Sequence, residues 1–184
     1  MTDFDALPEL TEAGLAKLSA LVLGVVPEAT KTWTLATDSP SYLDDAHRVV
    51  DEAQSWAGDA KAFIYVFRLV PPHPDPGAIA GCFAHAKRAE NGSRAYARLN
   101  KGYSSGCMYV GSSRTLPRRL GEHFGLGARG TYALQLQHWA SDLELNLQIE
   151  CAKYPDGLPS GVLQLLEDTL WSEERPMFGR RGAK

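Results

Sequence analysis

Arg119 and His123 are the first candidates for chemistry, because they lie four residues apart in a segment that reads as an amphipathic helix. Leu116 and Leu120 have the same spacing and would form the apolar face, so Arg119 and His123 would project side by side from another face. The helix follows a short apolar strand, residues 108–110, and a tight turn. A guanidinium and an imidazole held beside the end of a strand suit an anionic group such as a phosphodiester.

The part of the chain that follows this segment offers further regular elements. Residues 143–151 alternate between apolar and polar side chains, which predicts a half-buried strand. Residues 131–139 are expected to form a helix that begins near Thr131. Residues 161–174 are expected to form the last helix, with Ser160 as a candidate N-cap.

The elements before this segment include one strongly predicted strand. Residues 61–70 are rich in β-branched and aromatic side chains and stop at two prolines, which predicts a strand, whereas the Pro- and Gly-rich residues 71–83 predict a loop. Two helices are expected upstream, at residues 11–23 and from Ser39-Pro40 to about residue 56. On the second of these, Asp44, Asp45 and His47 favour a solvated acidic face over a metal cluster, because neighbouring helical positions point in different directions.

These elements predict an α/β protein of the α+β type, with a small mixed or antiparallel sheet of about three strands, flanking helices and an N-terminal helical extension. The expected units are an acidic helical region, residues 1–58, and a second domain, residues 59–184. A chain of 184 residues can bury one sizeable core. No apolar run reaches the roughly 20 residues that a membrane span needs, and the acidic N-terminus does not resemble a secretory signal, so we expect a cytoplasmic protein with no membrane partner.

Charge is unevenly distributed along the chain. Residues 1–60 have a net charge of −8 and residues 61–184 one of +5, so a polyanionic partner should meet the second part. The acidic region could dock there, recruit a protein partner or form an oligomer contact. The three cysteines show no CxxC spacing and are expected to be small buried residues.

A basic stretch within residues 84–106 is a candidate nucleic-acid surface, because bases interleaved with Tyr96 and Tyr103 could follow phosphates and stack on bases. An ordinary solvated helix or hairpin would show the same composition. The residues expected to contact nucleic acid are Lys87, Arg88, Arg94, Arg98, Lys101 and Arg118.

The second part of the chain, roughly residues 61–181, resembles the GIY-YIG nuclease superfamily. The two name-giving tripeptides correspond to Phe63-Ile64-Tyr65 and Tyr109-Val110-Gly111. The following helix has an arginine and a histidine in RRLGEH, a later helix has a glutamate in LLEDTLW, and the next segment reads Arg-Pro-Met-Phe. The order of these motifs is more specific than any one of them alone.

This resemblance implies a single divalent cation, Mg²⁺ or Mn²⁺, and a set of catalytic residues. Glu167 would be the only protein ligand of the cation, and Arg119 would clamp the scissile phosphate. Tyr65 would act as the base, Tyr109 would bind the phosphate or the attacking water, and His123 would relay the proton or bind the phosphate. The residues themselves also permit a Glu167–Arg175 ion pair, a core role for Tyr65, and a role for His123 as a cation at a helix C-terminus.

The chain departs from the family at three places. Phe63 occupies a position where glycine is usual, and Gly179 occupies one that is frequently asparagine. Tyr65 and Tyr109 are 44 positions apart, which implies an insertion at about residues 71–105 between two neighbouring strands.

The expected function is therefore metal-dependent hydrolysis of nucleic acid, with DNA as the expected substrate of an endonuclease. A nucleic-acid-binding module that does not cleave is the alternative on the same fold. An unrelated enzyme has less support, because the sequence contains no P-loop, dinucleotide fingerprint or GxSxG elbow.

Overall fold

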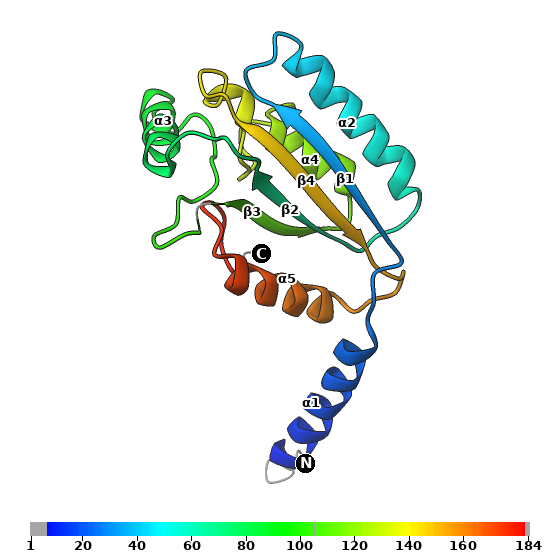
Figure 1. Cartoon of the computed structure of the whole chain (residues 1–184). Helices are drawn as coiled ribbons and strands as arrows, with labels where there is room; N and C mark the ends of the chain where they lie inside the picture. Colours follow the sequence, from blue (N-terminus) through cyan, green and yellow to red (C-terminus); the bar gives the residue numbers. More distant parts are fainter. Residues whose placement is uncertain (1–6, 105, 183–184) are drawn as a thin grey trace.

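Four antiparallel strands form the centre of the molecule, in the order β1-β4-β2-β3 (Figure 1). The computed structural model describes residues 7–104 and 106–182, so the extreme acidic N-terminus and the last two residues of the basic tail lie outside the described residues. The strands are β1 (Ala29–Ala36), β2 (Phe63–Leu69), β3 (Cys107–Ser113) and β4 (Asn146–Lys153). Strand β3 is therefore an edge strand, and β2 lies between β3 and β4.

Helices cover both faces of the sheet, which confirms the predicted α+β fold class. They are α1 (Leu7–Gly24), α2 (Tyr42–Ala57), α3 (Pro76–Ala89), α4 (Leu116–Phe124), the short 3₁₀ helix η1 (Leu136–His138) and α5 (Ser160–Glu174). Figure 1 shows α5 lying along the sheet and α1 projecting away from the rest of the molecule. None of the helices in the described ranges has the length and apolar character of a membrane span.

The central position of β2 explains its uninterrupted apolar sequence. Phe63, Tyr65 and Phe67 belong to the main core, which they share with α2 and α4. On the other face, Ile64 packs with Leu163 of α5, in a smaller cluster. A strand that is buried on both faces has no solvent-facing side. Its sequence is therefore a continuous run of apolar residues instead of an alternation of apolar and polar residues.

Strand β4 confirms the predicted alternation, with Leu147, Ile149 and Cys151 buried in the main core. Its partner β1 is an addition to the expected three strands, and it comes from the region expected to be helical. Because β1 pairs with β4 along its length and α2 packs against α4, residues 29–57 share the sheet and the core with the second part of the chain. A boundary at residue 58 would divide this core.

Two segments differ from the local prediction. Residues 76–83, expected to be part of a loop, form the first part of helix α3, because Asp75 accepts a hydrogen bond from the Gly77 amide at 2.7 Å and Pro76 fits the first helical turn. Residues 131–139 form only the short η1 instead of a helix, because Gln135 adopts a left-handed conformation with a φ of 57°.

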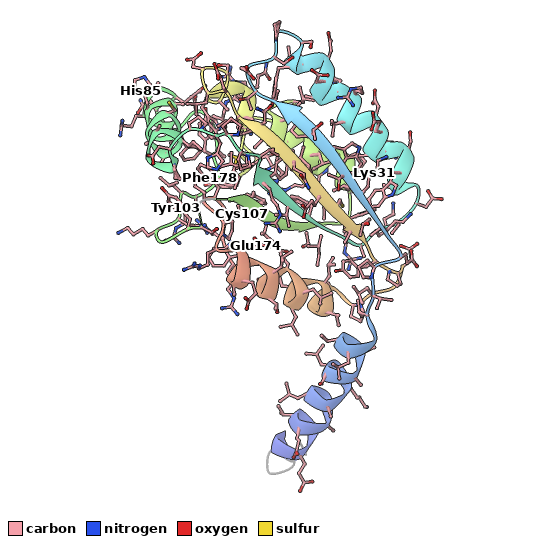
Figure 2. All side chains as sticks on the ribbon, in the orientation of Figure 1. Lys31, His85, Tyr103, Cys107, Glu174 and Phe178 are labelled. Carbon is pink, nitrogen blue, oxygen red and sulfur yellow. The ribbon has the colours of Figure 1, made fainter. Side chains whose placement is uncertain are left out.

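The C-terminal segment packs between the edge strand and the insertion. The amides of Met177 and Phe178 donate to the carbonyls of Cys107 and Met108, each at 2.8 Å. The Gly179 amide donates to the carbonyl of Arg98 in the insertion at 2.9 Å. Figure 2 shows Phe178 and Cys107 in this part of the molecule. The chain just after Gly179 is thereby fixed next to β3.

Candidate active site

Tyr65 reaches the edge of the sheet by lying across Gly111. The two residues are register partners in β2 and β3. A Cβ added to Gly111 would lie 2.6 Å from the Tyr65 hydroxyl oxygen and 2.8 Å from Cζ, so any side chain at this position would displace the phenol. The glycine that ends the second tripeptide is thus needed for the position of the tyrosine that ends the first.

Arg119 joins two tyrosines at this edge. Its Nε donates to the Tyr65 hydroxyl at 3.2 Å, and its Nη2 donates to the Tyr109 hydroxyl at 3.1 Å. Nη1 forms an ion pair with Glu122 at 2.9 Å, and the Tyr132 carbonyl accepts from Nη2 at 3.0 Å. The planar guanidinium is held in one orientation by these contacts, yet its side chain remains 19% exposed.

His123 lies behind Tyr65 and is fully buried. Its Nδ1 accepts a hydrogen bond from the Leu134 amide at 3.2 Å, so the proton of the neutral ring is on Nε2, which lies 3.0 Å from the Tyr65 hydroxyl. Burial, reinforced by the charge of Arg119, lowers the pKa of His123 well below its usual value. His123 is therefore a neutral donor to Tyr65, and neither a phosphate ligand nor a helix C-terminal cation.

The hydroxyl oxygen of Tyr65 accepts two hydrogen bonds, from Arg119 and His123. The hydroxyl proton of Tyr65 must consequently point away from both donors. Tyr65 also lines the adjoining pocket. Burial raises the pKa of Tyr65 well above its usual value, with a further contribution from Tyr109, whereas Arg119 acts in the opposite direction. Two hydrogen-bond donors, one of which is the cation Arg119, are features that stabilise a phenolate.

Glu167 approaches the same edge from α5, on the other face of the sheet. It is buried, and the hydroxyl of Ser112 on β3 donates to its Oε2. A pocket of about 200 Å³ is lined by Tyr65, Tyr109, Gly111, Ser112, Arg119, Gln164, Glu167 and Arg180. Four of the five expected catalytic residues meet in this pocket, and the fifth, His123, supports Tyr65 from behind.

The donor atoms of this pocket fit a hard divalent cation. No group of three or more His, Cys, Asp or Glu side chains that could hold a metal ion occurs in residues 7–104 and 106–182. Mg²⁺ does not require such a group, because it keeps several waters and is typically bound through one or two carboxylates. Glu167 can supply that carboxylate.

Comparisons with protein-family models, curated proteins and solved structures found no match. The resemblance to GIY-YIG nucleases therefore rests on the sequence motifs of this chain alone.

Arg180 is a pocket residue that the sequence analysis did not indicate, and it follows Gly179, which the sequence marked only as a departure from the family. Gly179 has a φ of 105°, and a Cβ there would lie 3.0 Å from Cε2 of Tyr109. The ring of Tyr109 thus occupies the space next to the position where the family frequently has asparagine. Arg180 follows directly and brings a second guanidinium to the pocket. Only the contact between Gly179 and Tyr109, which are 70 positions apart, reveals this arrangement.

The predicted nucleic-acid residues divide into exposed and buried groups. Lys87, Arg88 and Arg98 line a hollow of about 560 Å³, which we call the basic groove. Lys101 is exposed, and the side chain of Arg118 is 74% exposed with an ion pair to Glu122 at 3.2 Å.

Arg94 and Tyr96 contradict the prediction of a nucleic-acid surface, because both are buried. Arg94 donates to the Gln135 side chain at 3.1 Å and lies 3.6 Å from Glu90. Tyr96 packs edge-on against Phe83. These two residues stabilise the insertion from within and cannot serve as a phosphate contact or a stacking surface.

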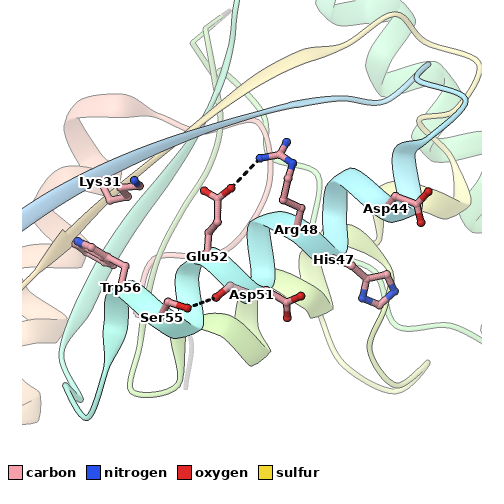
Figure 3. Close-up of a pocket in the computed structure, with 8 residues that line it drawn as sticks. All are labelled: Lys31, Asp44, His47, Arg48, Asp51, Glu52, Ser55 and Trp56. Carbon is pink, nitrogen blue, oxygen red and sulfur yellow. Dashed lines mark hydrogen bonds and ion pairs between the residues drawn. The ribbon is translucent and has the colours of Figure 1, made fainter.

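A wider hollow of about 830 Å³ lies on the outward face of α2 (Figure 3). Arg48 forms an ion pair with Glu52 at 3.0 Å in this hollow, and Lys31 of β1 lies at one end. None of the residues that line it belongs to the Glu167 pocket. Its exposed charges are typical of a solvated helix face.

Proposed function

We propose that this protein is a metal-dependent endonuclease of the GIY-YIG type that hydrolyses phosphodiester bonds, with DNA as its substrate. The supporting observation is that Tyr65, Arg119 and Glu167 line one small pocket although they come from three separate elements of the chain. The sequence motifs select the same three residues for their chemistry, independently of their position in the fold. Their meeting at the sheet edge supports a shared role.

The phosphate is held by the cations of the pocket. Arg119 lines the pocket and donates to two tyrosines, so its guanidinium is already oriented when the substrate arrives. Arg180 adds a second positive charge from the C-terminal segment. Two guanidinium groups would stabilise the negative charge that develops on the phosphate oxygens in the transition state.

Tyr65 is the proposed general base. Its hydroxyl accepts from Arg119 and His123, and both donors would stabilise the negative charge that remains after the phenol loses its proton. A phenolate at this position would take the proton of the attacking water, and Tyr109 would orient that water or the phosphate. His123 acts on the reaction through Tyr65, by holding its ring and its oxygen.

A bound Mg²⁺ or Mn²⁺ would supply positive charge to the leaving oxygen and would favour the phenolate of Tyr65. Glu167 is the residue that would hold this cation, with Ser112 fixing one of its carboxylate oxygens. The carboxylate is otherwise an unfavourable neighbour for Tyr65, because the charge of Glu167 contributes to the raised pKa of that phenol.

Nucleic acid would bind across the basic groove and the pocket together. The Gly179 amide donates a hydrogen bond to the carbonyl of Arg98, which lines the groove. Arg180, which lines the pocket, is the next residue after Gly179, so the groove and the pocket are joined at this point. Such a path would meet phosphates with successive bases, as a nucleic-acid backbone requires.

A protein partner or oligomer contact at the N-terminal region is a further part of the proposal. Helix α1 presents Leu15, Leu21 and Leu23 to solvent, and these apolar side chains would suit a protein surface. A cytoplasmic location is consistent with the free thiols of all three cysteines.

A nucleic-acid-binding module without cleavage is the second candidate. It is favoured by the burial of Tyr65, which raises the pKa of the phenol and makes the residue a poor base without added positive charge. The position of Gly179, where the family frequently has asparagine, also favours it.

Binding and cleavage measured on one oligonucleotide duplex separate the two candidates. Purified protein is titrated into fluorescent duplex with Ca²⁺ to measure affinity, and the same duplex is then incubated with Mn²⁺ to measure strand scission. Scission by the wild type and its loss in Glu167→Ala would support the nuclease. Binding without scission would support the binding module, and the absence of binding even at low salt would overturn both.

A further inference from the structure

Helix α5 presents a second oxygen atom to the pocket that contains Glu167. Gln164 lies three residues before Glu167, so the two side chains share one face of the helix, and both line the pocket of about 200 Å³. The side-chain oxygen of Gln164, Oε1, is buried and has no hydrogen-bond partner among the described residues. Buried polar atoms in folded proteins are nearly always satisfied, so this oxygen needs a partner that the described residues do not supply.

Asp168 determines which end of the Gln164 amide faces the pocket. Oδ1 of Asp168 accepts from Nε2 of Gln164 at 2.9 Å and from the Gly182 amide at 2.8 Å. An ionised carboxylate only accepts hydrogen bonds, so the amide nitrogen must face Asp168 and the amide oxygen must face away from it. The C-terminal segment, through Gly182, thereby holds Asp168, and Asp168 in turn orients Gln164.

The partner that this oxygen requires must be a cation or a hydrogen-bond donor. The Oε1 atom of Gln164 and the carboxylate of Glu167 are both acceptors, and together they would repel the oxygens of a phosphate. Carboxylate and amide oxygens are, in contrast, the ligand types that hard divalent cations prefer. We propose that Gln164 is a second protein ligand, next to Glu167, for the divalent cation of this site.

This inference rests on the proposed function for the presence of a cation, but it adds a ligand that the family resemblance does not supply. The resemblance implies Glu167 alone, with waters. A second oxygen ligand on the same helix would fix the cation relative to α5 and would make cation binding depend on the C-terminal segment that holds Asp168.

Binding of Mn²⁺ in the absence of DNA, measured by electron paramagnetic resonance, tests the inference directly. Gln164→Met keeps the length of the side chain but removes its oxygen, and should weaken Mn²⁺ binding by about tenfold or more. Gln164→Glu adds a negative charge and should bind Mn²⁺ at least as tightly as the wild type. Gln54→Met, on the exposed face of α2, is the control and should change nothing.

The inference is supported only if Gln164→Met binds Mn²⁺ more weakly than the wild type and Gln164→Glu binds it equally or more tightly. Both variants must first be shown to be folded, by their unfolding midpoints without metal. Any other pattern, including no Mn²⁺ binding by the wild type, overturns it. If Gln164 merely packs α5, Mn²⁺ binding should be unchanged in Gln164→Met, which keeps the length of the side chain. Plasmid nicking is measured in parallel. Mn²⁺ binding with the expected pattern but without nicking would overturn the proposed nuclease function and leave the metal-ligand role of Gln164 standing.

Discussion

The phenol of Tyr65 occupies the space that a side chain at Gly111 would need. The two residues face each other in β2 and β3, and a Cβ on Gly111 would lie 2.6 Å from the Tyr65 hydroxyl oxygen. Because β3 is the edge strand, this crossing brings the hydroxyl from an interior strand to the pocket that Arg119 and Glu167 also line.

Substitution Gly111→Ala should therefore abolish cleavage and lower the free energy of unfolding by about 1–3 kcal/mol, since the added methyl group overpacks a buried site. Gly121→Ala is the matched control, because its nearest neighbours would be Val50 and Leu126 at 3.8 Å and 3.9 Å. It should keep full activity and gain about 0.5–1 kcal/mol of stability from the helical alanine. Chemical denaturation and plasmid nicking measure both effects, and wild-type nicking by Gly111→Ala would refute the crossing as a requirement.

The loss of Arg119 should slow the chemical step more than it weakens binding. Arg119→Ala and Arg119→Lys are each expected to reduce the single-turnover cleavage rate by about 100-fold or more, because lysine cannot donate to Tyr65 and Tyr109 with one planar group. Far-ultraviolet circular dichroism should show an unchanged fold.

Arg118→Ala is the control for this experiment, since the side chain of Arg118 is 74% exposed and outside the pocket. It should weaken DNA binding slightly and leave the rate at saturating DNA close to that of the wild type. Equal rate losses in the Arg118 and Arg119 variants would contradict the clamp assigned to Arg119.

Stability should fall as the pH drops below about 6.5, the ordinary pKa of histidine. Burial and Arg119 lower the pKa of His123, so below pH 6.5 the unfolded chain takes up a proton that the folded protein does not. The free energy of unfolding then decreases by up to about 1.4 kcal/mol per pH unit for this residue. The effect ends once the pH falls below the folded-state pKa.

Urea denaturation of the wild type and of His123→Gln at pH 7.5 and 5.5 isolates this contribution. The variant keeps an amide donor for Tyr65 but cannot titrate, so it should lose less stability between the two pH values. His138, whose pKa burial also lowers, is present in both proteins and cancels in the comparison. Identical losses of stability would show that His123 is not held neutral.

Neutralising the basic groove should weaken DNA binding without slowing the chemical step. A variant with Lys87→Ala, Arg88→Ala and Arg98→Ala should bind duplex DNA more weakly. The slope of log affinity against log salt concentration should become shallower by up to about 0.9 for each phosphate that the protein no longer neutralises. The residues line one hollow and are exposed, so the fold should not change.

Arg48→Ala is the control for the groove, because Arg48 is an exposed base on α2 that forms an ion pair with Glu52. Fluorescence anisotropy at several salt concentrations should show no change in slope for this variant. An unchanged slope in the triple variant would instead exclude the groove from the DNA path.

Elements with a strong local pattern could be predicted from the sequence. The strand around Tyr65, the alternation in β4 and the strand-turn-helix before Phe124 all depend on short-range periodicity, which tertiary contacts did not override. The motif order also selected Tyr65, Arg119 and Glu167, which come from separate elements and line one pocket.

The missed features depend on contacts between distant residues. Strand β1 is largely polar and exposed, and only Trp33 and Leu35 in its second half are buried, so it showed little apolar character. Arg94 looked like a surface base, but Gln135, 41 positions away, provides its buried hydrogen-bond partner. Gln164 has the sequence context of an ordinary helix residue, and only its contact with Asp168, which Gly182 holds, determines how it is oriented.

The proposal of a metal-dependent nuclease depends above all on the carboxylate of Glu167. Nicking of supercoiled plasmid in Mn²⁺ by the wild type and by Glu167→Gln tests it. Glu167→Gln keeps the size of the side chain and an acceptor for Ser112, so a folded variant lacking only the negative charge is expected. We expect the wild type to convert plasmid to the nicked form, EDTA to stop this reaction, and Glu167→Gln to be inactive. No nicking by the wild type, or equal nicking by both proteins, would contradict the proposal.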